Sequence, residues 1–346
     1  MKIPAIVNYE QRDGAVELRE VDVPDVGEDD VLLEVAAASV CGSDIHMYHN
    51  TLGYPVNTPV ILGHEFGGYI ARKGKNVRGF KEGDRVVSET AAVICGQCIY
   101  CRTGEYNICP NRLGFGYGVD GAFTKYVRVP ARCLHHIPDH LPFERAALTE
   151  PACVAYNALA VKSQINPGDF VVVIGPGPIG LFALQLACLM GAGRIVVCGI
   201  NVDAKRLEVA KRLGADVIIN SSAVDPVEVV LSYDDRFGAD LIVDAVGIPA
   251  TVRQAIDMVR PGGQITKIGW GPQPLNFSLD PLVAKAARLQ GSYSHNYKTW
   301  ERVIQLLADD KLRAQPLISQ VCSLDGWRDA FHAMESGDAV KAVIKP

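Results

Sequence analysis

Six residues in the middle of the chain, Gly175-Pro176-Gly177-Pro178-Ile179-Gly180, give the strongest indication of its architecture. They follow an apolar run at 170–174, open a second apolar run at 179–190, and match the pattern G-x-G-x-x-G. In this pattern the first glycine makes a tight turn, the second lets the backbone approach a pyrophosphate, and the third lets the helix pack on the strand. The amides and dipole at the start of the helix favour phosphate. A glycine-rich turn without a ligand is the alternative, but the strand-turn-helix setting favours a dinucleotide site.

On both sides of this motif, the hydrophobic pattern divides the chain into different regions. The predicted strands after residue 168 lie at 170–174, 194–199, 217–220, 241–244 and 264–268, and they alternate with predicted helices at 179–190 and 203–213. Such alternation predicts βαβ crossovers and a doubly wound parallel sheet, and therefore an α/β fold. Residues 1 to about 155 show short strands instead, such as 31–35 and 84–87. The C-terminal part predicts helices near 300–308 and 327–336 and a strand at 339–344.

The residues after the motif bear on the choice of dinucleotide. About twenty residues beyond such a motif, an acidic residue usually hydrogen-bonds the adenosine ribose. Counting along this chain ends on Asn201, which can bond a hydroxyl but does not repel a 2′-phosphate as a carboxylate would. Lys205 and Arg206 could pair with such a phosphate or be solvated helix residues, and Asp203 fits a helix cap. These residues together favour NAD as the dinucleotide and leave NADP open. The predicted cofactor-binding residues are Gly175, Gly177, Pro178, Ile179, Gly180, Asn201, Arg206, Val246 and Ile268.

Length, charge and hydropathy exclude several classes of protein. At 346 residues with 48% hydrophobic residues, the chain can build two domains with large cores. Its net charge of −5, without a basic cluster, argues against a nucleic-acid partner. Residues 170–193 are uncharged and long enough to span a bilayer, but residues 175–178 break the run, which favours a buried strand and helix. With no secretory signal at the start, we expect a cytoplasmic protein with no membrane partner.

Four of the ten cysteines are crowded together as Cys95-x2-Cys98-x2-Cys101-x7-Cys109. Without a secretory signal, such crowding indicates thiolate metal ligands rather than disulfides. Four thiolates close a tetrahedral zinc site with no open position, which suits a structural role. An iron–sulfur cluster is the alternative, but the bacterial ferredoxin run has three residues before its last cysteine, and here there are seven. A nucleic-acid-binding zinc module is disfavoured because Arg102 is the only basic residue within the run.

A second set of metal-binding residue types is dispersed over three segments: Cys41-Gly42-Ser43-Asp44-Ile45-His46, Gly63-His64-Glu65 and Thr149-Glu150-Pro151. A single cysteine or histidine is more often a packing residue. The interpretation of this set as a metal site therefore depends on the two stronger motifs, the glycine turn at 175–180 and the cysteine run at 95–109. A thiolate, an imidazole and a carboxylate leave the fourth zinc position for water or an alcohol. Zinc lowers the pKa of bound water to about 7 and should acidify an alcohol likewise. Such an alcohol could donate hydride.

Taken together, CGSDIH, GHE, the four-cysteine loop, TEP and GPGPIG resemble the zinc-containing medium-chain dehydrogenase/reductase family, in its sorbitol/threonine dehydrogenase-like branch. The match covers essentially the whole chain. It implies a β-rich GroES-like catalytic domain at 1–155 and 291–346, with a Rossmann domain at 156–290 between its parts. It also implies two zinc ions per chain, a structural one at the four cysteines and a catalytic one.

The resemblance assigns roles around the catalytic zinc. Cys41 and His64 would bind it, with Glu65 or Glu150 as the third protein ligand, and Asp44 would orient His64. Ser43 would relay the substrate proton. His46 is a possible next station because imidazole titrates near neutrality, although a surface histidine is an equal alternative.

The predicted function is oxidation of a secondary alcohol (a polyol, sugar alcohol or diol) by hydride transfer to NAD(P). The alternatives are oxidation of an amino alcohol such as threonine, and NADPH-dependent reduction of an aldehyde or ketone. A zinc-containing regulator without turnover would not need Cys41, His64 and Ser43 together. Residues that could line the substrate pocket, or simply pack, are Tyr48, His49, Tyr54, Phe115, Tyr117, His295, Asn296 and Tyr297. By resemblance, we expect a homodimer or homotetramer.

Overall fold

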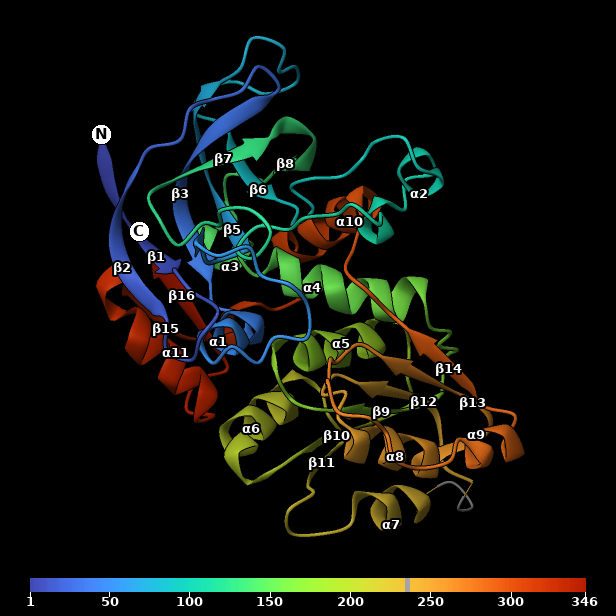
Figure 1. Cartoon of the computed structure of the whole chain (residues 1–346). Coiled ribbons are helices and arrows are strands. Elements are labelled where there is room, and N and C mark those ends of the chain that lie inside the picture. Colours follow the sequence, from blue (N-terminus) through green and yellow to red (C-terminus); the bar gives the residue numbers. More distant parts are fainter. Residues whose placement is uncertain (234–236) are drawn as a thin grey trace. The chain divides into compact units, whose positions relative to one another are not determined.

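The computed structural model describes residues 1–233 and 237–346, which form two compact units (Figure 1). The first unit consists of Met1–Glu150, His295–Asp310 and Ala314–Pro346. The second consists of Pro151–Ser294 and Lys311–Arg313. The first unit therefore combines residues from both ends of the chain. The predicted boundaries, after residue 155 and before residue 291, refer to domains that fold independently. Compactness does not test independent folding, so these boundaries stay a prediction.

The second unit is built on one six-stranded sheet in the order β11-β10-β9-β12-β13-β14, and every neighbouring pair is parallel. This is the strand order of the doubly wound dinucleotide fold, which confirms the predicted parallel sheet. The strands are β9 (Phe170–Ile174), β10 (Arg194–Gly199), β11 (Val217–Asn220), β12 (Ala239–Asp244), β13 (Val259–Lys267) and β14 (Arg288–Gly291). The helices are α5 (Pro178–Leu189), α6 (Ala204–Leu213), α7 (Pro226–Leu231), α8 (Pro249–Met258) and α9 (Asp280–Ala284).

Burial explains why the central strand was easy to predict and the edge strand was not. All five residues of β9 are buried, because helices cover both faces of the sheet, with α5 on one face and α8 on the other (Figure 1). A strand in that position is apolar along its whole length. Strand β14 lies at the edge, is mostly exposed and lacks an apolar run, so sequence analysis missed it. The short helices α7 and α9, and helix α8, were also missed.

The first unit contains two sheets. A three-stranded sheet has the order β2-β1-β4, and a seven-stranded sheet has the order β15-β16-β3-β5-β6-β8, with β7 also paired to β3. The strands are β1 (Lys2–Asn8), β2 (Val16–Asp22), β3 (Asp30–Ser39), β4 (Val60–Ile61), β5 (Glu65–Lys73), β6 (Arg85–Ser88), β7 (Tyr126–Pro130), β8 (Leu134–His136), β15 (Ile318–Ser323) and β16 (Lys341–Lys345). The helices that begin in this unit are α1 (Gly42–Tyr48), α2 (Ile99–Arg102), α3 (Phe143–Ala146), α4 (Thr149–Tyr156), α10 (Tyr297–Ala308) and α11 (Trp327–Glu335).

The seven-stranded sheet joins the two ends of the chain. Strand β16 pairs antiparallel with β3, which in turn pairs with β5, so red and blue ribbons lie side by side in Figure 1. Phe66 and Phe123 share one buried hydrophobic cluster with Trp327 and Phe331 of α11. This packing places the C-terminal strand beside the segments that carry Cys41 and His64.

The uncharged run at 170–193 contains β9 and α5, as predicted, rather than one long helix. Among the described residues, no helix has both the length and the apolar character needed to cross a membrane.

Candidate active site and metal centres

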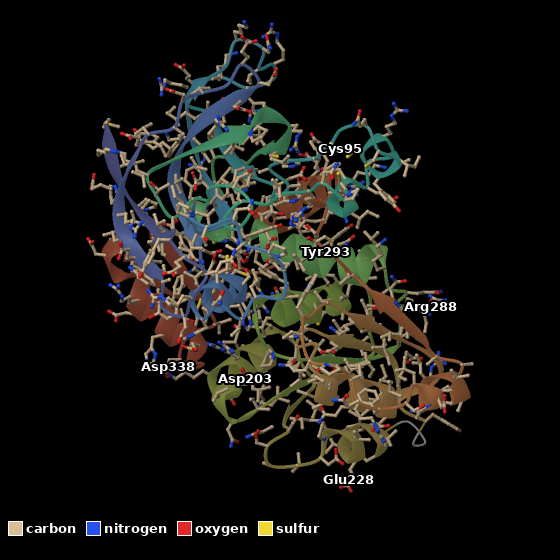
Figure 2. All side chains as sticks on the ribbon, in the orientation of Figure 1. Cys95, Asp203, Glu228, Arg288, Tyr293 and Asp338 are labelled. Atoms are coloured by element: carbon tan, nitrogen blue, oxygen red, sulfur yellow. The ribbon has the colours of Figure 1, made fainter. Side chains whose placement is uncertain are left out.

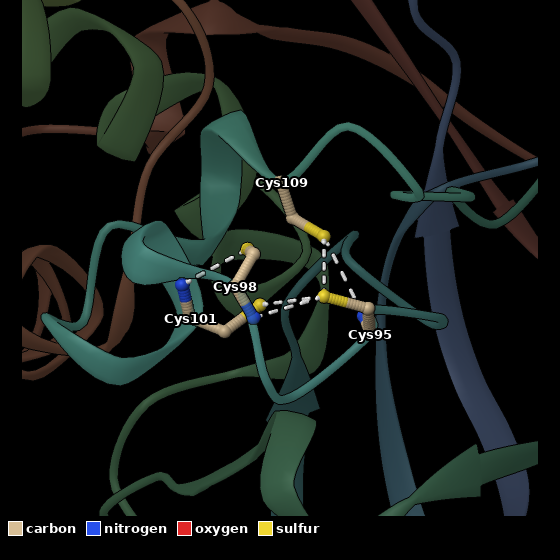
Figure 3. Close-up of side chains that lie close together, drawn as sticks. All are labelled: Cys95, Cys98, Cys101 and Cys109. Carbon is tan, nitrogen blue, oxygen red and sulfur yellow. Dashed lines mark hydrogen bonds between the residues drawn. The ribbon is translucent and has the colours of Figure 1, made fainter.

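The four crowded cysteines lie together on one loop of the first unit, which Figure 2 marks at Cys95 and Figure 3 shows in close-up. Their sulfur atoms all lie within 4.8 Å of one another. The Sγ atom of Cys95 is 3.8 Å from that of Cys101 and 3.7 Å from that of Cys109. Sulfurs at the corners of a tetrahedron with Zn–S distances of about 2.3 Å would be about 3.8 Å apart, whereas a disulfide needs about 2.05 Å. The separations therefore fit a closed zinc site and do not fit disulfides.

Backbone amides of the same loop point at these sulfurs. The N–H of Cys98 donates to Sγ of Cys95 at 3.3 Å, and the N–H of Cys101 donates to Sγ of Cys98 at 3.5 Å. The N–H of Cys95 donates to Sγ of Cys109 at 3.4 Å. Because such bonds favour the thiolate, the amides of Gln97 and Cys98 lower the pKa of Cys95 to about 6. Zinc binds the thiolate form, so the sulfur of Cys95 is prepared for a metal ion, whereas burial and the hydrogen bonds with Cys98 and Cys109 raise the pKa of Cys101 to about 12.

A second group of potential ligands forms where α1 and β5 begin. The ligand atoms of Cys41, His64 and Glu65 all lie within 4.8 Å of one another. Cys41 directly precedes α1, and Glu65 is the first residue of β5. Glu150 is not a member of this group, but its charge acts on both His64 and Glu65. Of the two glutamates that sequence analysis left open, Glu65 is the one placed with Cys41 and His64.

Asp44 connects the two turns that carry these residues. Its carboxylate accepts from the N–H of Cys41 at 2.8 Å and from the N–H of Gly63 at 3.3 Å. Gly63 has a φ of 93°, and a Cβ there would lie 2.5 Å from the ring of Phe123, so the turn before His64 requires glycine. We predicted that Asp44 orients His64, but the nearest oxygen is 3.8 Å from Nδ1, beyond hydrogen-bond distance. Asp44 therefore acts on the backbone of the site.

Lys341 is a site residue that sequence analysis missed. Its Nζ donates to Oε1 of Glu65 at 2.8 Å, and the hydroxyl of Ser39 donates to Oε2. All three side chains are buried. Ser39 and Glu65 are register partners on β3 and β5, and β16 brings Lys341 to the other edge of β3. Lys341 is the single lysine in the otherwise apolar strand predicted at 339–344, and this was the sequence signal that could have revealed it.

Glu150 is held by His295 and Trp300. The Nε2 atom of His295, which is 2% exposed, is 3.0 Å from Oε1 of Glu150. The indole N–H of Trp300 donates to Nδ1 of His295 at 2.7 Å. Because an indole N–H can only donate, Nδ1 is the acceptor, and the ring proton lies on Nε2, facing Glu150. Burial raises the pKa of Glu150, but the hydrogen bond from His295 and the charges of His64 and Lys341 outweigh it and lower the pKa overall.

The charges around His64 suit a bound cation. Burial disfavours a charged imidazole, yet the charges of Cys41, Asp44 and Glu150 raise the pKa of His64 to about 10. The buried Nδ1 atom of His64 has no hydrogen-bond partner among the described residues. A pocket that holds a proton this strongly also favours a metal cation in its place. Its sulfur, nitrogen and carboxylate oxygen donors are the ligand set that catalytic zinc accepts.

Ser43 and His46 lie on α1, three residues apart, so they share one side of the helix. Ser43 is half-buried two residues after Cys41, whereas His46 is exposed and its Nδ1 lies 2.9 Å from the hydroxyl oxygen of Thr51. The ring keeps contact with solvent, but the protein around it removes part of its hydration, and this partial desolvation together with the nearby His49 lowers the pKa of His46 below its ordinary value. The ring is therefore neutral at pH 7 and can accept a proton.

Some residues named as possible pocket residues are engaged in other contacts. Tyr48 packs edge-on against Phe331, and Phe115 is buried edge-on against Phe66. Both ring nitrogens of His49 lie close to surface carboxylates. These three residues therefore have structural roles in the first unit.

Comparison with known proteins identifies the family. Two family models match, the alcohol dehydrogenase GroES-like domain over residues 27–139 and the zinc-binding dehydrogenase model over residues 178–309. Sorbitol dehydrogenase of Halalkalibacterium halodurans is 40% identical to this chain over 99% of both proteins. The chain belongs to the zinc-dependent medium-chain dehydrogenases. D-arabitol-phosphate dehydrogenase of Enterococcus avium is 37% identical to this chain, over 94% of this chain and 92% of the Enterococcus protein.

Solved structures of related dehydrogenases contain dinucleotides. A zinc-binding dehydrogenase of Sinorhizobium meliloti bound to NADP is 28% identical, with a TM-score of 0.92 over the whole of both chains. An alcohol dehydrogenase of Escherichia coli complexed with NADH is 27% identical, with a TM-score of 0.90 over 100% of this chain and 99% of that one. This dehydrogenase is thus an oxidoreductase with a GroES-like domain and a Rossmann-like parallel sheet, in the sorbitol/threonine dehydrogenase-like branch, as the resemblance implied.

The glycine turn of this dehydrogenase has the shape that the motif predicted. Gly175 has a φ of 95°, and a Cβ there would lie 2.6 Å from the side chain of Val246. A Cβ at Gly180 would lie 1.9 Å from the carbonyl oxygen of Gly175, so α5 packs directly on the turn. Gly177 directly precedes Pro178, the first residue of α5, and a Cβ at Gly177 would meet nothing within 4 Å. Space is therefore left where a pyrophosphate would approach the backbone.

Of the other predicted cofactor-binding residues, Val246, Ile268 and Asn201 each follow a strand of the same sheet. Val246 follows β12 and Ile268 follows β13, and the backbone N–H groups of both donate to Asp244, at the end of β12. Asn201 follows β10, and its side-chain oxygen accepts from the amide of Asn220 at 2.8 Å. All of them lie at the carboxyl edge of the parallel sheet, where ligands of such folds bind.

Asp203 occupies the predicted cap position, as the residue directly before α6. Asp203 (labelled in Figure 2) precedes α6, but its side chain makes no capping bond to that helix. Its carboxylate instead accepts from the N–H of Ile200 at 3.1 Å and from the guanidinium of Arg206 at 2.9 Å. The charged guanidinium is a stronger partner than a helix amide, so the carboxylate turns toward it. Arg206, predicted to bind cofactor, is therefore engaged with Asp203 in this structure.

Proposed function

We propose that this dehydrogenase oxidises a secondary alcohol of the polyol, sugar-alcohol or diol type, with a nicotinamide dinucleotide as hydride acceptor. The observation that carries the proposal is the group Cys41, His64 and Glu65, whose ligand atoms lie within 4.8 Å of one another. The names of two relatives, a sorbitol dehydrogenase and a D-arabitol-phosphate dehydrogenase, support the substrate class. Reduction of the corresponding ketone is the same reaction in reverse.

We assign two zinc ions to each chain. Cys95, Cys98, Cys101 and Cys109 would hold the structural ion. Cys41, His64 and Glu65 would hold the catalytic ion, with Glu150 beside them. When bound there, zinc would supply Lewis-acid chemistry that makes a substrate hydroxyl acidic near neutral pH.

The protein's own residues then prepare and move the substrate proton. Ser43 would accept the hydroxyl proton, and His46, on the same side of α1, would carry it toward solvent. Asp44 fixes the backbone of the two ligand turns at Cys41 and at Gly63, and Lys341 balances the charge of Glu65. A buried carboxylate without that lysine would resist ionisation.

For the dinucleotide, we propose the turn at 175–180 as the pyrophosphate site and Asn201 as the ribose contact. NAD is favoured over NADP because Arg206 is paired with Asp203 and would have to leave it to bind a 2′-phosphate. A homodimer or homotetramer in the cytoplasm remains our expectation for the assembled enzyme.

The test is a panel of sorbitol, other polyols, vicinal diols and L-threonine, each offered with NAD and with NADP to fully zinc-loaded protein. Absorbance of the reduced dinucleotide reports turnover. We expect polyols or diols to give the highest kcat/KM, and NAD to exceed NADP. Turnover confined to threonine would replace the proposed substrate class with amino alcohols, and no turnover with any alcohol would overturn the proposal.

A further inference from the structure

Glu150 is the end of a series of buried contacts that the proposed function does not use. His295 contacts Glu150 through Nε2 at 3.0 Å and accepts from the indole of Trp300 through Nδ1 at 2.7 Å. Trp300 lies on α10 and is 1% exposed. All three residues belong to the first unit.

The indole of Trp300 is itself held in place from its other side. Its ring stacks on that of His135, with centroids 5.4 Å apart and planes 13° apart. The two nitrogens of His135 lie 3.1 Å from a carboxylate oxygen of Glu89 and 2.6 Å from one of Glu301. Because His135 is held at both nitrogens, the indole cannot turn without losing its stacking on that ring. The direction of its N–H is therefore determined by the packing.

That direction decides which nitrogen of His295 carries a proton. A neutral imidazole has one N–H and one acceptor nitrogen, and the indole occupies the acceptor. Without the indole N–H, His295 could place its proton on Nδ1 instead. The lone pair of Nε2 would then face the carboxylate of Glu150 at 3.0 Å, and Glu150 would turn away.

We propose that Trp300 is a positioning residue of the metal centre: its N–H fixes the tautomer of His295, and His295 in turn holds the carboxylate of Glu150, whose negative charge acts on His64 and Glu65. The inference rests on the proposed function only in requiring a metal at that group. Partners of this kind, which bind a metal-site residue from behind, change metal affinity by about 10- to 100-fold when removed.

The test compares Trp300→Phe with Trp327→Phe. Both tryptophans are 1% exposed and lie in the first unit, but the indole of Trp327 makes no hydrogen bond to any described residue. Phenylalanine keeps an aromatic ring in each position and removes the N–H. Zinc retained per chain is measured after dialysis against increasing concentrations of dipicolinate. The four-cysteine site serves as an internal reference in every sample.

We expect Trp300→Phe to lose one of two zinc ions at a chelator concentration about 10- to 100-fold lower than wild type, and to keep the other. Trp327→Phe should match wild type. In His295→Gln, the amide oxygen can accept from Trp300 and the amide N–H can donate to Glu150, so zinc retention should be largely restored relative to His295→Leu. The His295 pair also keeps the inference testable if Trp300→Phe does not fold.

Equal zinc retention in Trp300→Phe and Trp327→Phe, or in His295→Gln and His295→Leu, would overturn the inference. Because no substrate is present, this result is separate from the proposed function. A wild-type protein that turns over polyols while the variants hold zinc equally refutes only the role of Trp300. A protein whose variants differ as expected but which oxidises no alcohol refutes only the proposed function.

Discussion

Replacing Lys341 by methionine tests how the first unit tolerates a buried carboxylate at its centre. Lys341 and Glu65 have side chains that are 2% and 0% exposed, so water cannot screen the charge that remains. Removing one partner of a buried ion pair costs about 3–5 kcal/mol, because the other charge is left uncompensated. The hydroxyl of Ser39 still donates to Glu65, but a single neutral donor does not replace an ammonium. We expect Lys341→Met to lower the free energy of unfolding by about this amount.

Urea denaturation followed by tryptophan fluorescence measures the effect, since Trp300 and Trp327 both report on the first unit. With an urea dependence of about 1–3 kcal/mol per M, the midpoint should fall by at least about 1 M. Lys345→Met is the matched control, on the same strand. Its partner Glu144 is 2.8 Å away, but the two side chains are 54% and 29% exposed. Such a surface pair contributes about 0.2–1 kcal/mol, so the control should change little.

The double variant Lys341→Met, Glu65→Gln distinguishes loss of a charge partner from loss of packing. With both charges removed, no uncompensated charge is buried, and the double variant should recover more than half of the stability lost by Lys341→Met. Denaturation with and without excess zinc separates this effect from any change in metal binding. If Lys341→Met behaves like Lys345→Met, or if the double variant is no more stable than the single one, the buried ion pair does not stabilise the fold as argued.

Three further outcomes follow from the site. Ser43→Ala should reduce turnover by roughly 10²-fold while both zinc ions are retained, which steady-state kinetics and zinc analysis measure. Unchanged turnover would exclude Ser43 from the relay. Because the pKa of His46 lies below its ordinary value of 6.5, kcat should fall as the pH drops through that lowered pKa and the ring gains its proton; His46→Ala should flatten this acid limb, and an unaltered profile would exclude His46. Gly180→Ala should abolish NADH binding measured by fluorescence, because its Cβ would lie 1.9 Å from the oxygen of Gly175, whereas Gly177→Ala, with open space, should fold normally and weaken only NADH binding. Equal NADH binding by the two glycine variants would contradict this geometry.

The parts of the structure that sequence analysis predicted correctly are those set by neighbouring residues. The turn at 175–180 needs glycines at fixed offsets, and the five predicted strands of the parallel sheet are apolar runs between turns. The four cysteines are close in sequence, so any compact loop brings their sulfurs together. Asp203 lies at the predicted cap position before α6, but its carboxylate binds the N–H of Ile200 and the guanidinium of Arg206 instead of an amide of α6. Periodicity and spacing do not register such a choice of partner.

The pairings that sequence analysis missed join residues far apart in the chain. Lys341 is 276 residues from Glu65, and His295 is 145 residues from Glu150. Neither pair follows from hydrophobic pattern or motif spacing, because β16 must first pair with β3, and the segment before α10 must return to the first unit. In both cases a buried carboxylate has its partner supplied by the C-terminal part of the chain. The metal group at Cys41, His64 and Glu65 can therefore acquire its final charge balance only after both ends of the chain have packed together.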